Sequence, residues 1–433
     1  MKLLIQGGRL LDPANGVDRV ADLLVVDGRI AAIENGIGEG AADRVVDARG
    51  KVVAPGFIDI HVHLRTPGQE YKEDMRTGTA AAVRGGFTGV VCMPNTSPVI
   101  DNVTVVGHVQ RLAAEQGLCR VWSSGAITKG SKGEELAEIG EMREAGIVAI
   151  TDDGHPVMNG ETMRQAMIYA HQFGIPVMDH CEDKNLSGGG AMHEGAVSSA
   201  LGLKGIPSAS EEVQVARNIL LSLETGAHVH MQHLSSRYSV ELVRWGKRLG
   251  ANVSCEATPH HFSLTDQIVA DLNYSTNTKM NPPVRTEADR QAIVAGLADG
   301  TIDVIATDHA PHSFDEKEVE YQYALFGITG LETAVGLALD RLVRPGHITL
   351  EQMIRLMSTR PAELMGLTPP ALVEDAVADI TLFDPEQRWT VEAAKMASKS
   401  KNTPFGGWEL TGAPYATVVG GELRMLGMQV LAQ

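Results

Sequence analysis

Histidines recur where short apolar runs of the sequence end. The chain has 15 histidines, and eleven of them lie at or directly after such a run: His61, His63, His155, His180, His228, His230, His233, His260, His261, His309 and His312. A single buried histidine is most often structural. Histidines that leave several parallel strands at the same edge instead indicate metal coordination.

His61 and His63 form the first candidate pair, because residues two apart on a strand point to the same face. His180, His233 and Asp308 follow three later apolar runs in the same way. Four imidazoles and one carboxylate are more ligands than a single tetrahedral ion takes. The pattern therefore predicts two metal ions.

Two neighbouring cations usually need a bridging anion. The candidates are Asp152 and Asp153, which follow the apolar run 147–150. Only one of the two is expected to face the metal ions, because successive side chains of an extended chain point to opposite sides. The alternative is that the pair serves an Asx-type turn and binds nothing.

The elements that must bring these side chains together alternate between short apolar strands and amphipathic helices. Strands are predicted at 57–60, 89–93, 121–124, 147–150, 176–178, 228–232, 252–255 and 304–306. Helices are predicted at 75–84, 103–115, 134–145, 160–173, 211–223, 239–249, 287–297, 330–341 and 350–357. This repeat predicts an α/β fold, a (β/α)8 TIM-type barrel over residues 55–365, whose strand ends meet at one mouth.

Both ends of the chain carry a different pattern. Short apolar runs separated by turn residues fill the first fifty residues, and strand patterns return at 378–383 and 415–419. We expect segments 1–54 and 366–433 to form a small β-sandwich domain together. Within the barrel, Ser208 and Glu211 predict a capping box at the start of a helix.

The composition argues against several classes of function. Lys and Arg number 37 against 54 Asp and Glu, a net charge of −17, and no basic run exceeds two residues. We therefore expect no nucleic-acid partner and no anionic membrane surface. No segment approaches ~18 uninterrupted apolar residues, and the first residues do not resemble a signal peptide. The four scattered cysteines suit a reducing compartment, so a cytoplasmic protein is expected.

Seven segments around these residues resemble the amidohydrolase superfamily, in the form found in the dihydroorotase family. They are 56–65 (GFIDIHVHLR), 93–96 (MPNT), 151–154 (TDDG), 233–235 (HLS), 256–261 (EATPHH), 281–285 (NPPVR) and 307–312 (TDHAPH). The resemblance extends over nearly the whole chain.

The resemblance implies a metal centre and a set of substrate contacts. One zinc ion would be held by His61, His63, Asp153 and Asp308, and the second by Asp153, His180 and His233. Many members of the superfamily bridge two metals with a carboxylated lysine, whereas here Asp153 stands at that strand end. The implied substrate contacts are His63, Arg65, Asn95, Asn281, His312 and the backbone of Phe326 and Gly327.

The reaction implied by the resemblance is the reversible interconversion of N-carbamoyl-L-aspartate and (S)-dihydroorotate plus water, a step of pyrimidine biosynthesis. Arg65 would bind the carboxylate of this small substrate, and a zinc-activated water would attack the ring carbonyl. Asp308 is then the expected catalytic residue, which carries a proton from the attacking water to the leaving ring nitrogen.

Two alternative functions would use the same kind of fold. A hydantoinase or allantoinase uses the same barrel on another cyclic amide, but such relatives usually carry the bridging lysine and lack an arginine at the position of Arg65. A non-catalytic subunit that scaffolds aspartate transcarbamoylase typically loses metal ligands, whereas all six positions are intact here.

The sequence is compatible with more than one possibility for three further features. They are a homodimer, a complex of the active enzyme with aspartate transcarbamoylase, and the role of the charged segment 313–322. That segment follows Asp308 closely, and it is either a lid over the mouth or a solvated loop.

Overall fold

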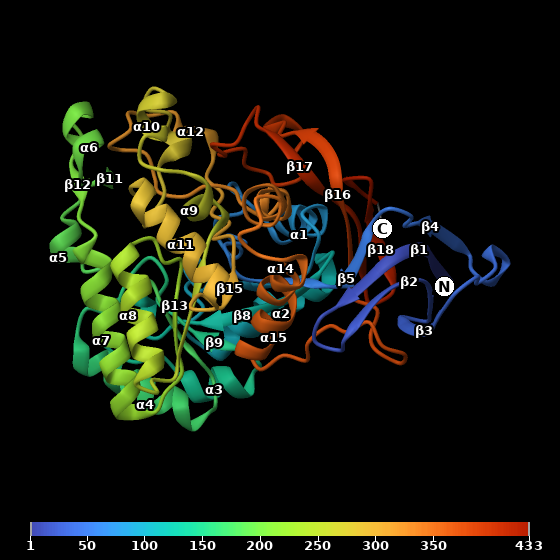
Figure 1. The fold of residues 1–433 in the computed structure, drawn as a ribbon. Coiled ribbons are helices and arrows are strands. Elements are labelled where there is room, and N and C mark those ends of the chain that lie inside the picture. The colour runs from blue at the N-terminus through green and yellow to red at the C-terminus, as the bar shows by residue number, and fades with distance from the viewer. Residues whose placement is uncertain (1, 432–433) are drawn as a thin grey trace.

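The computed structural model in Figure 1 describes residues 2–431. At its centre is an eight-stranded parallel sheet in the order β15-β14-β13-β10-β9-β8-β7-β6. These strands are β6 (Phe57–Val62), β7 (Phe87–Cys92), β8 (Arg120–Gly125), β9 (Ala149–Ile150), β10 (Val177–Asp179), β13 (Val229–Met231), β14 (Val253–Ala257) and β15 (Val304–Ile305).

The ends of this sheet meet at the mouth of a barrel. Val62 at the end of β6 forms a parallel bridge with His309 beyond β15, and the amide of His63 donates to the carbonyl of His309 over 2.8 Å. Every residue of β6, β7 and β14 is buried, as expected for strands covered on both faces. The predicted (β/α)8 barrel is confirmed.

Helices surround the barrel on its outside (Figure 1). The longer ones are α1 (Met75–Arg84), α2 (Val103–Gln116), α4 (Gly160–Gln172), α7 (Ala209–Thr225), α8 (Arg237–Arg248) and α11 (Glu287–Asp299). Each of these six lies within two residues of its predicted ends. Shorter helices are α3 (Ile139–Glu144), α5 (Lys184–Ser187), α6 (Ala196–Leu201), α9 (Pro259–Ser263), α10 (Ile268–Asp271), α12 (Phe314–Lys317), α13 (Ala334–Ala338), α14 (Leu350–Ile354) and α15 (Arg360–Leu364).

Two predicted helices are shorter than the sequence pattern indicated. The helix expected at 134–145 is reduced to α3, because Leu136 forms an antiparallel bridge with Thr128 instead. The helix expected at 330–341 begins only at α13, and it continues as a π-helical segment over Leu339–Val343. Its predicted start, Gly330, donates its amide to Nδ1 of His309, which holds that part of the chain against the barrel.

The capping box predicted for Ser208 and Glu211 is wrong. Ser208 has helical dihedral angles, and its side chain caps no amide. Glu211 is buried and accepts the backbone amides of Ser235 and Ser236 over 3.1 and 3.0 Å. The carboxylate therefore satisfies amides that would otherwise lie unpaired beyond β13, where a buried orphan donor is costly.

The two ends of the chain form one mixed nine-stranded sheet. The β1 strand (Lys2–Asp12) pairs with β2 (Val17–Val26), β4 (Arg44–Asp47) and β5 (Val52–Pro55), and β3 (Arg29–Glu34) extends the sheet from β2. From the other end of the chain come β16 (Ile380–Thr390), β17 (Glu409–Val419), β18 (Glu422–Leu426) and β19 (Gln429–Val430).

The strands from the two ends of the chain lie side by side, blue against red in Figure 1, because β5 and β16 pair antiparallel. Their apolar side chains share one core, which includes Leu3, Leu23, Ile380 and Val418. A short two-stranded sheet, β11 (Met192–His193) with β12 (Gly205–Ile206), lies between α5 and α7.

One part of the carboxyl-terminal region returns to the barrel. Residues 396–403, named the C-terminal strap here, lie between β16 and β17. The amides of Ala397 and Ser398 donate to the buried carboxylate of Glu332, and Asn402 contacts the loops at the barrel mouth. The strap therefore links the terminal sheet to the region where the candidate ligands lie.

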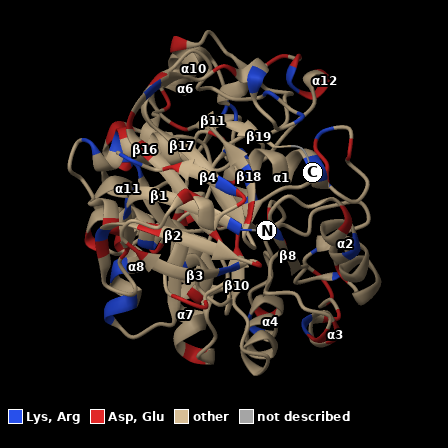
Figure 2. Ribbon diagram, turned by 90° about the vertical axis from the view of Figure 1, so that its right-hand side faces the viewer, with Lys and Arg blue, Asp and Glu red and all other residues tan. Residues whose placement is uncertain are grey.

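Acidic and basic residues are interspersed over the face drawn in Figure 2. Some of them join neighbouring helices, as in the ion pairs of Arg164 with Glu224 and of Arg244 with Asp299. Within residues 2–431, no helix has the length and apolar character needed to cross a membrane.

Candidate active site

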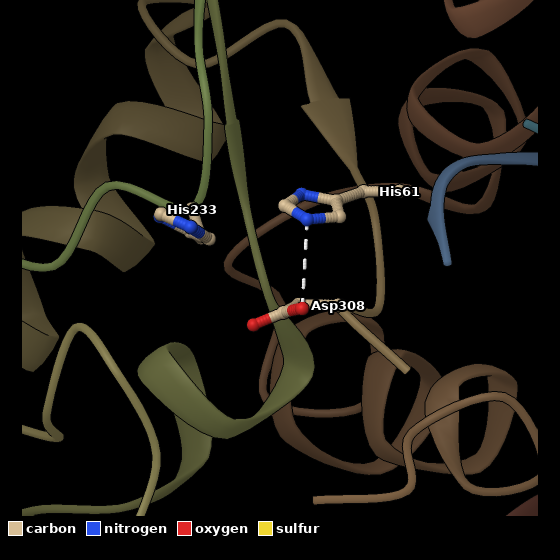
Figure 3. Close-up of side chains that lie close together, drawn as sticks. All are labelled: His61, His233 and Asp308. Atoms are coloured by element: carbon tan, nitrogen blue, oxygen red, sulfur yellow. Dashed lines mark ion pairs between the residues drawn. The ribbon is translucent and has the colours of Figure 1, made fainter. Parts of the chain in front are cut away.

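Six histidine and aspartate side chains meet at the carboxyl ends of the barrel strands. His61 lies in β6 and His63 directly after it, and the others follow β9, β10, β13 and β15: Asp153, His180, His233 and Asp308. All six residues are more than nine-tenths buried. Figure 3 shows His61, His233 and Asp308, which come from three different segments, close to one another.

Two imidazoles and two carboxylates form one half of this cluster. Nε2 of His61 lies 3.4 Å from Oδ1 of Asp153 and 3.5 Å from Oδ1 of Asp308. Nε2 of His63 lies 3.3 Å from Oδ2 of Asp153 and 3.0 Å from Oδ1 of Asp308. Each imidazole therefore faces both carboxylates.

Asp153 also belongs to the other half. Its Oδ1 lies 3.8 Å from Nδ1 of His180 and 3.9 Å from Nε2 of His233. One possible ligand atom from each of Asp153, His180 and His233 lies within 4.8 Å of the others, and the same holds for His61, His63 and Asp153. A carboxylate shared by two such groups has the position that a bridging ligand needs.

The neighbouring acid, Asp152, has a different environment. Its carboxylate accepts the amides of Ile127 and Thr128 over 2.8 and 3.1 Å, and it also accepts the Thr128 hydroxyl. The structure therefore brings only Asp153 to the cluster, and Asp152 satisfies the backbone of the loop after β8.

The chemistry of these donors fits a metal centre. Nε2 of His61 is buried and has no hydrogen-bond partner among the described residues, although buried polar atoms are nearly always paired. A buried ring nitrogen that has no hydrogen-bond partner and faces carboxylate oxygens and other imidazoles has the surroundings of a metal ligand. Imidazole and carboxylate donors suit zinc and other divalent transition metals.

Three polar side chains contact the imidazoles of candidate ligands on the side away from the cluster. Nδ1 of His61 lies 2.6 Å from Glu256, and Nδ1 of His63 lies 2.9 Å from the side-chain oxygen of Asn95. Nε2 of His180 lies 2.9 Å from Glu182. In each ring the other nitrogen is the one that faces the cluster, which is the usual arrangement around a protein-bound metal.

Glu182 and Glu256 had no role predicted from the sequence. Both are buried carboxylates at strand ends, Glu182 two residues after His180 and Glu256 within β14. Their position in the sequence was the available signal, because alternate residues at a strand end share a face. Glu256 also accepts the backbone amide of His233 over 3.1 Å.

Burial and close charges shift the pKa values in the cluster strongly. Burial opposes protonation of His61, but the carboxylates of Glu256 and Asp153 outweigh it and raise its pKa well above the usual range. Burial raises the pKa of Asp153, but His61 and His63 outweigh it and lower that pKa well below the usual range. Burial and the neighbouring His180 lower the pKa of His233 to about 3. In the metal-free protein, the neighbouring carboxylates therefore favour the protonated form of His61.

The backbone is strained at three of the candidate residues. Arg65, His233 and Asp308 have φ values of 55°, 33° and 47°. Non-glycine residues in this left-handed region cost about 1–3 kcal/mol each and cluster at functional sites. The fold therefore holds these side chains in position before any ligand arrives.

A cavity of about 330 Å³ opens beside the cluster. Its lining includes every candidate ligand except His61, and it includes all the predicted substrate contacts: His63, Arg65, Asn95, Asn281, His312, Phe326 and Gly327. Arg65 is buried, its Nε donates to the carbonyl of Pro311 over 3.1 Å, and its Nη2 lies 3.4 Å from Nε2 of His312.

The two asparagine side chains contact residues in or next to the histidine and aspartate cluster. Asn95 faces His63 with its oxygen, and its Nδ2 lies 3.3 Å from the carbonyl oxygen of Asp153. Nδ2 of Asn281 donates to Glu182 over 2.8 Å. The oxygen of Asn281 is therefore the atom left for a ligand, which makes this residue a hydrogen-bond acceptor.

The backbone at Phe326 and Gly327 is largely engaged within the protein. The amide of Gly327 donates to the carbonyl of Lys279, and its carbonyl accepts Nδ2 of Asn402. The carbonyl of Phe326 lies 2.8 Å from Nε2 of His312. The Phe326 amide has no hydrogen-bond partner among the described residues. It is therefore the backbone group of this segment that is free for the predicted substrate contact.

Segment 313–322 packs against the protein. It begins with α12, and the ammonium group of Lys317 is buried, where it donates to the carbonyl of Leu325 over 2.7 Å. Tyr321 is buried too, whereas Phe314 is 75% exposed. The segment therefore differs from a freely solvated loop.

Comparisons with known proteins identify the family. A family model described as Dihydro-orotase-like matches residues 50–239. Proteins named Dihydroorotase from Pelotomaculum thermopropionicum and Citrifermentans bemidjiense are 54% and 51% identical to this chain, each over 98% of the chain and 99% of their own length. The solved structure of L-hydantoinase (dihydropyrimidinase) from Arthrobacter aurescens has a TM-score of 0.89 at 25% identity, covering 100% of this chain and 97% of its own. The chain belongs to the dihydroorotase family.

Proposed function

We propose that this protein is a zinc-dependent dihydroorotase, which interconverts N-carbamoyl-L-aspartate and (S)-dihydroorotate plus water. Its relatives over nearly the full length are named Dihydroorotase. The substrate is a small cyclic amide that carries one carboxylate, and the site must therefore combine a hydrolytic centre with an anion-binding group.

The main support for this proposal is that the guanidinium group of Arg65 is buried without an ion-pair partner within residues 2–431. Its guanidinium group is buried beside the cluster, and no carboxylate of the described residues lies within ion-pair distance of it. Burial lowers its pKa from the usual value, as expected for a cation without a close counter-ion. A buried, unpaired guanidinium suits bidentate binding of a substrate carboxylate.

The metal centre follows from the two halves of the cluster. His61, His63, Asp153 and Asp308 would hold one zinc ion, and Asp153 with His180 and His233 the other. When bound, zinc supplies Lewis acidity, which makes water a better nucleophile at neutral pH and stabilises negative charge on the ring carbonyl oxygen.

Asp308 is the residue placed to move the proton. Burial raises the pKa of Asp308, but His61 and His63 outweigh it and lower the pKa below the usual value, so the carboxylate is charged at neutral pH. It lines the cavity. Asp308 accepts the proton of the attacking water and delivers it to the ring nitrogen as the amide bond breaks. In the direction of ring closure the same carboxylate takes the proton from the carbamoyl nitrogen.

Arg65 and Asn281 orient the ring for this step. Arg65 binds the carboxylate at one end of the cavity, and the oxygen of Asn281 accepts a ring N–H. Substrate bound in this way presents its carbonyl to the metal cluster. Positioning of this kind reduces the entropic part of the barrier.

The assay that tests the proposal follows loss of dihydroorotate by its ultraviolet absorbance, with hydantoin and allantoin as comparison substrates. We expect turnover of dihydroorotate to exceed that of the other two, because only dihydroorotate offers Arg65 a carboxylate. Turnover of hydantoin or allantoin alone would favour a different cyclic amidohydrolase. A zinc-loaded protein inactive on all three would favour the scaffold function, and co-elution with aspartate transcarbamoylase would then be the next measurement.

A further inference from the structure

Asn402 lies between the two loops that form one wall of the active-site cavity. It belongs to the C-terminal strap and is only 4% exposed. Its Nδ2 donates to the carbonyls of Ala310 and Gly327 over 3.1 and 3.0 Å, and its Oδ1 accepts the amide of His312 over 3.2 Å. All three of these partners line the cavity.

The three hydrogen bonds determine which way the amide of Asn402 points. Both N–H groups meet carbonyl oxygens, and the side-chain oxygen meets an N–H group. Aspartate would place a second oxygen against two carbonyls, and serine is too short and offers only one donor. Asparagine is therefore the residue that joins these loops.

The loop that Asn402 holds is also the one that positions Arg65. The carbonyl of Pro311 accepts Nε of Arg65 over 3.1 Å, and the ring of His312 lies 3.4 Å from Nη2 of Arg65. Asn402 bonds to the residues on both sides of Pro311, namely the carbonyl of Ala310 and the amide of His312. A shift of this loop would move the guanidinium with it.

The strap itself is anchored at points away from these loops. The amides of Ala397 and Ser398 donate to Glu332 over 2.9 and 3.0 Å. The hydroxyl of Ser400 donates to the carbonyl of Lys72 over 2.6 Å. Asn402 is therefore presented by a fixed segment, which allows it to hold the loops in place.

We propose that Asn402 is a positioning residue for the substrate-carboxylate subsite, acting through the loop 310–312 on Arg65. This inference rests on the proposed function, in which Arg65 binds the substrate carboxylate. It gives the carboxyl-terminal region, far from the barrel in sequence, a part in substrate specificity. Loss of Asn402 should weaken the binding of a carboxylate-bearing ligand and leave the metal ligands in place.

The test uses the full-length, zinc-loaded protein with Asn402→Asp and Asn402→Ser, so that one variant remains if the other fails to fold. We expect the KM for dihydroorotate and the inhibition constant of its planar analogue orotate each to rise roughly tenfold or more, since each lost hydrogen bond is worth about 1 kcal/mol. The zinc content should equal that of the wild type, and kcat should fall less than KM rises.

Lys401→Gln is the matched control. Lys401 donates to the carbonyls of Met396 and Ser398 inside the strap and makes no bond to the two loops. Its KM for dihydroorotate should stay within about twofold of the wild type, on the scale of ordinary surface substitutions. Hydrogen exchange of the peptide 309–313 should be faster in both Asn402 variants and unchanged in Lys401→Gln.

Two results would overturn the inference. One is a folded Asn402 variant with unchanged KM and unchanged exchange at 309–313. The other is a joint loss of zinc, kcat and thermal stability, which would show a general structural role. If the wild type does not turn over dihydroorotate, the proposed function fails instead, and the exchange result still decides whether Asn402 holds the loop.

Discussion

Nδ1 of His61 lies 2.6 Å from Oε1 of Glu256, and both side chains are fully buried. A proton between these two atoms leaves the lone pair of Nε2 directed toward Asp153 and Asp308. The same Glu256 oxygen accepts the backbone amide of His233. One carboxylate therefore orients the ring of one proposed ligand and the backbone of another.

Replacing Glu256 should weaken zinc binding. In Glu256→Gln the ring of His61 loses its charged partner, and we expect zinc affinity to fall roughly 10- to 100-fold, as for other residues that orient metal-binding histidines. Competition with a chromophoric chelator measures the zinc affinity. Glu115→Gln, which removes an exposed carboxylate paired with Arg111, is the control and should bind zinc like the wild type.

Zinc binding should release a proton near neutral pH. The raised pKa of His61 means that the metal-free protein carries a proton there at pH 7, and zinc must displace it. Below that pKa, zinc affinity should therefore rise up to tenfold per pH unit as the pH increases, and it should level off above it. Calorimetric titration in buffers of different ionisation enthalpy counts the protons. Glu256→Gln should release fewer protons than the wild type. Equal proton release by both proteins would exclude Glu256 as the cause of the raised His61 pKa.

Arg65→Lys should act mainly on substrate binding. Lysine keeps the charge but loses the planar pair of donors, so we expect the KM for dihydroorotate to rise roughly tenfold with a smaller change in kcat. Steady-state kinetics at fixed zinc content measures both. An unchanged KM would mean that the substrate carboxylate binds elsewhere.

Asp308→Asn should separate metal binding from proton transfer. The amide oxygen can still occupy the position of the carboxylate, but it cannot accept the proton, and kcat should fall about 10²- to 10⁴-fold. Metal analysis of the same sample should find most of the zinc retained. A rate close to the wild type would exclude Asp308 as the proton carrier.

The convergence of the six proposed ligands could be predicted from the sequence, because the alternation of strands and helices predicts a barrel. Parallel strands end at one mouth, so residues as distant as His61 and Asp308 had to meet once the strands were recognised. The residue pattern alone left the choice between Asp152 and Asp153 open, and only the family resemblance favoured Asp153. The choice depends on which acid accepts the amides of Ile127 and Thr128, and in the structure that acid is Asp152.

Contacts between segments distant in sequence could not be predicted from the sequence. Glu211 fits a capping box in its local sequence, yet it bonds to Ser235 and Ser236 across the fold. Asn402 lies 90 residues from His312, between the strands predicted at 378–383 and 415–419, and no local signal relates it to the site. Such pairings follow from tertiary packing, which overrides local preferences.

Titration of zinc into the chelated protein, with dihydroorotate turnover followed at each step, tests whether the hydrolytic centre uses two zinc ions bridged by Asp153. Activity should be absent without metal and rise to a plateau at two zinc ions per chain, and Asp153→Ala should reach no plateau. Full turnover by the metal-free protein, or by Asp153→Ala, would exclude a two-zinc centre bridged by Asp153.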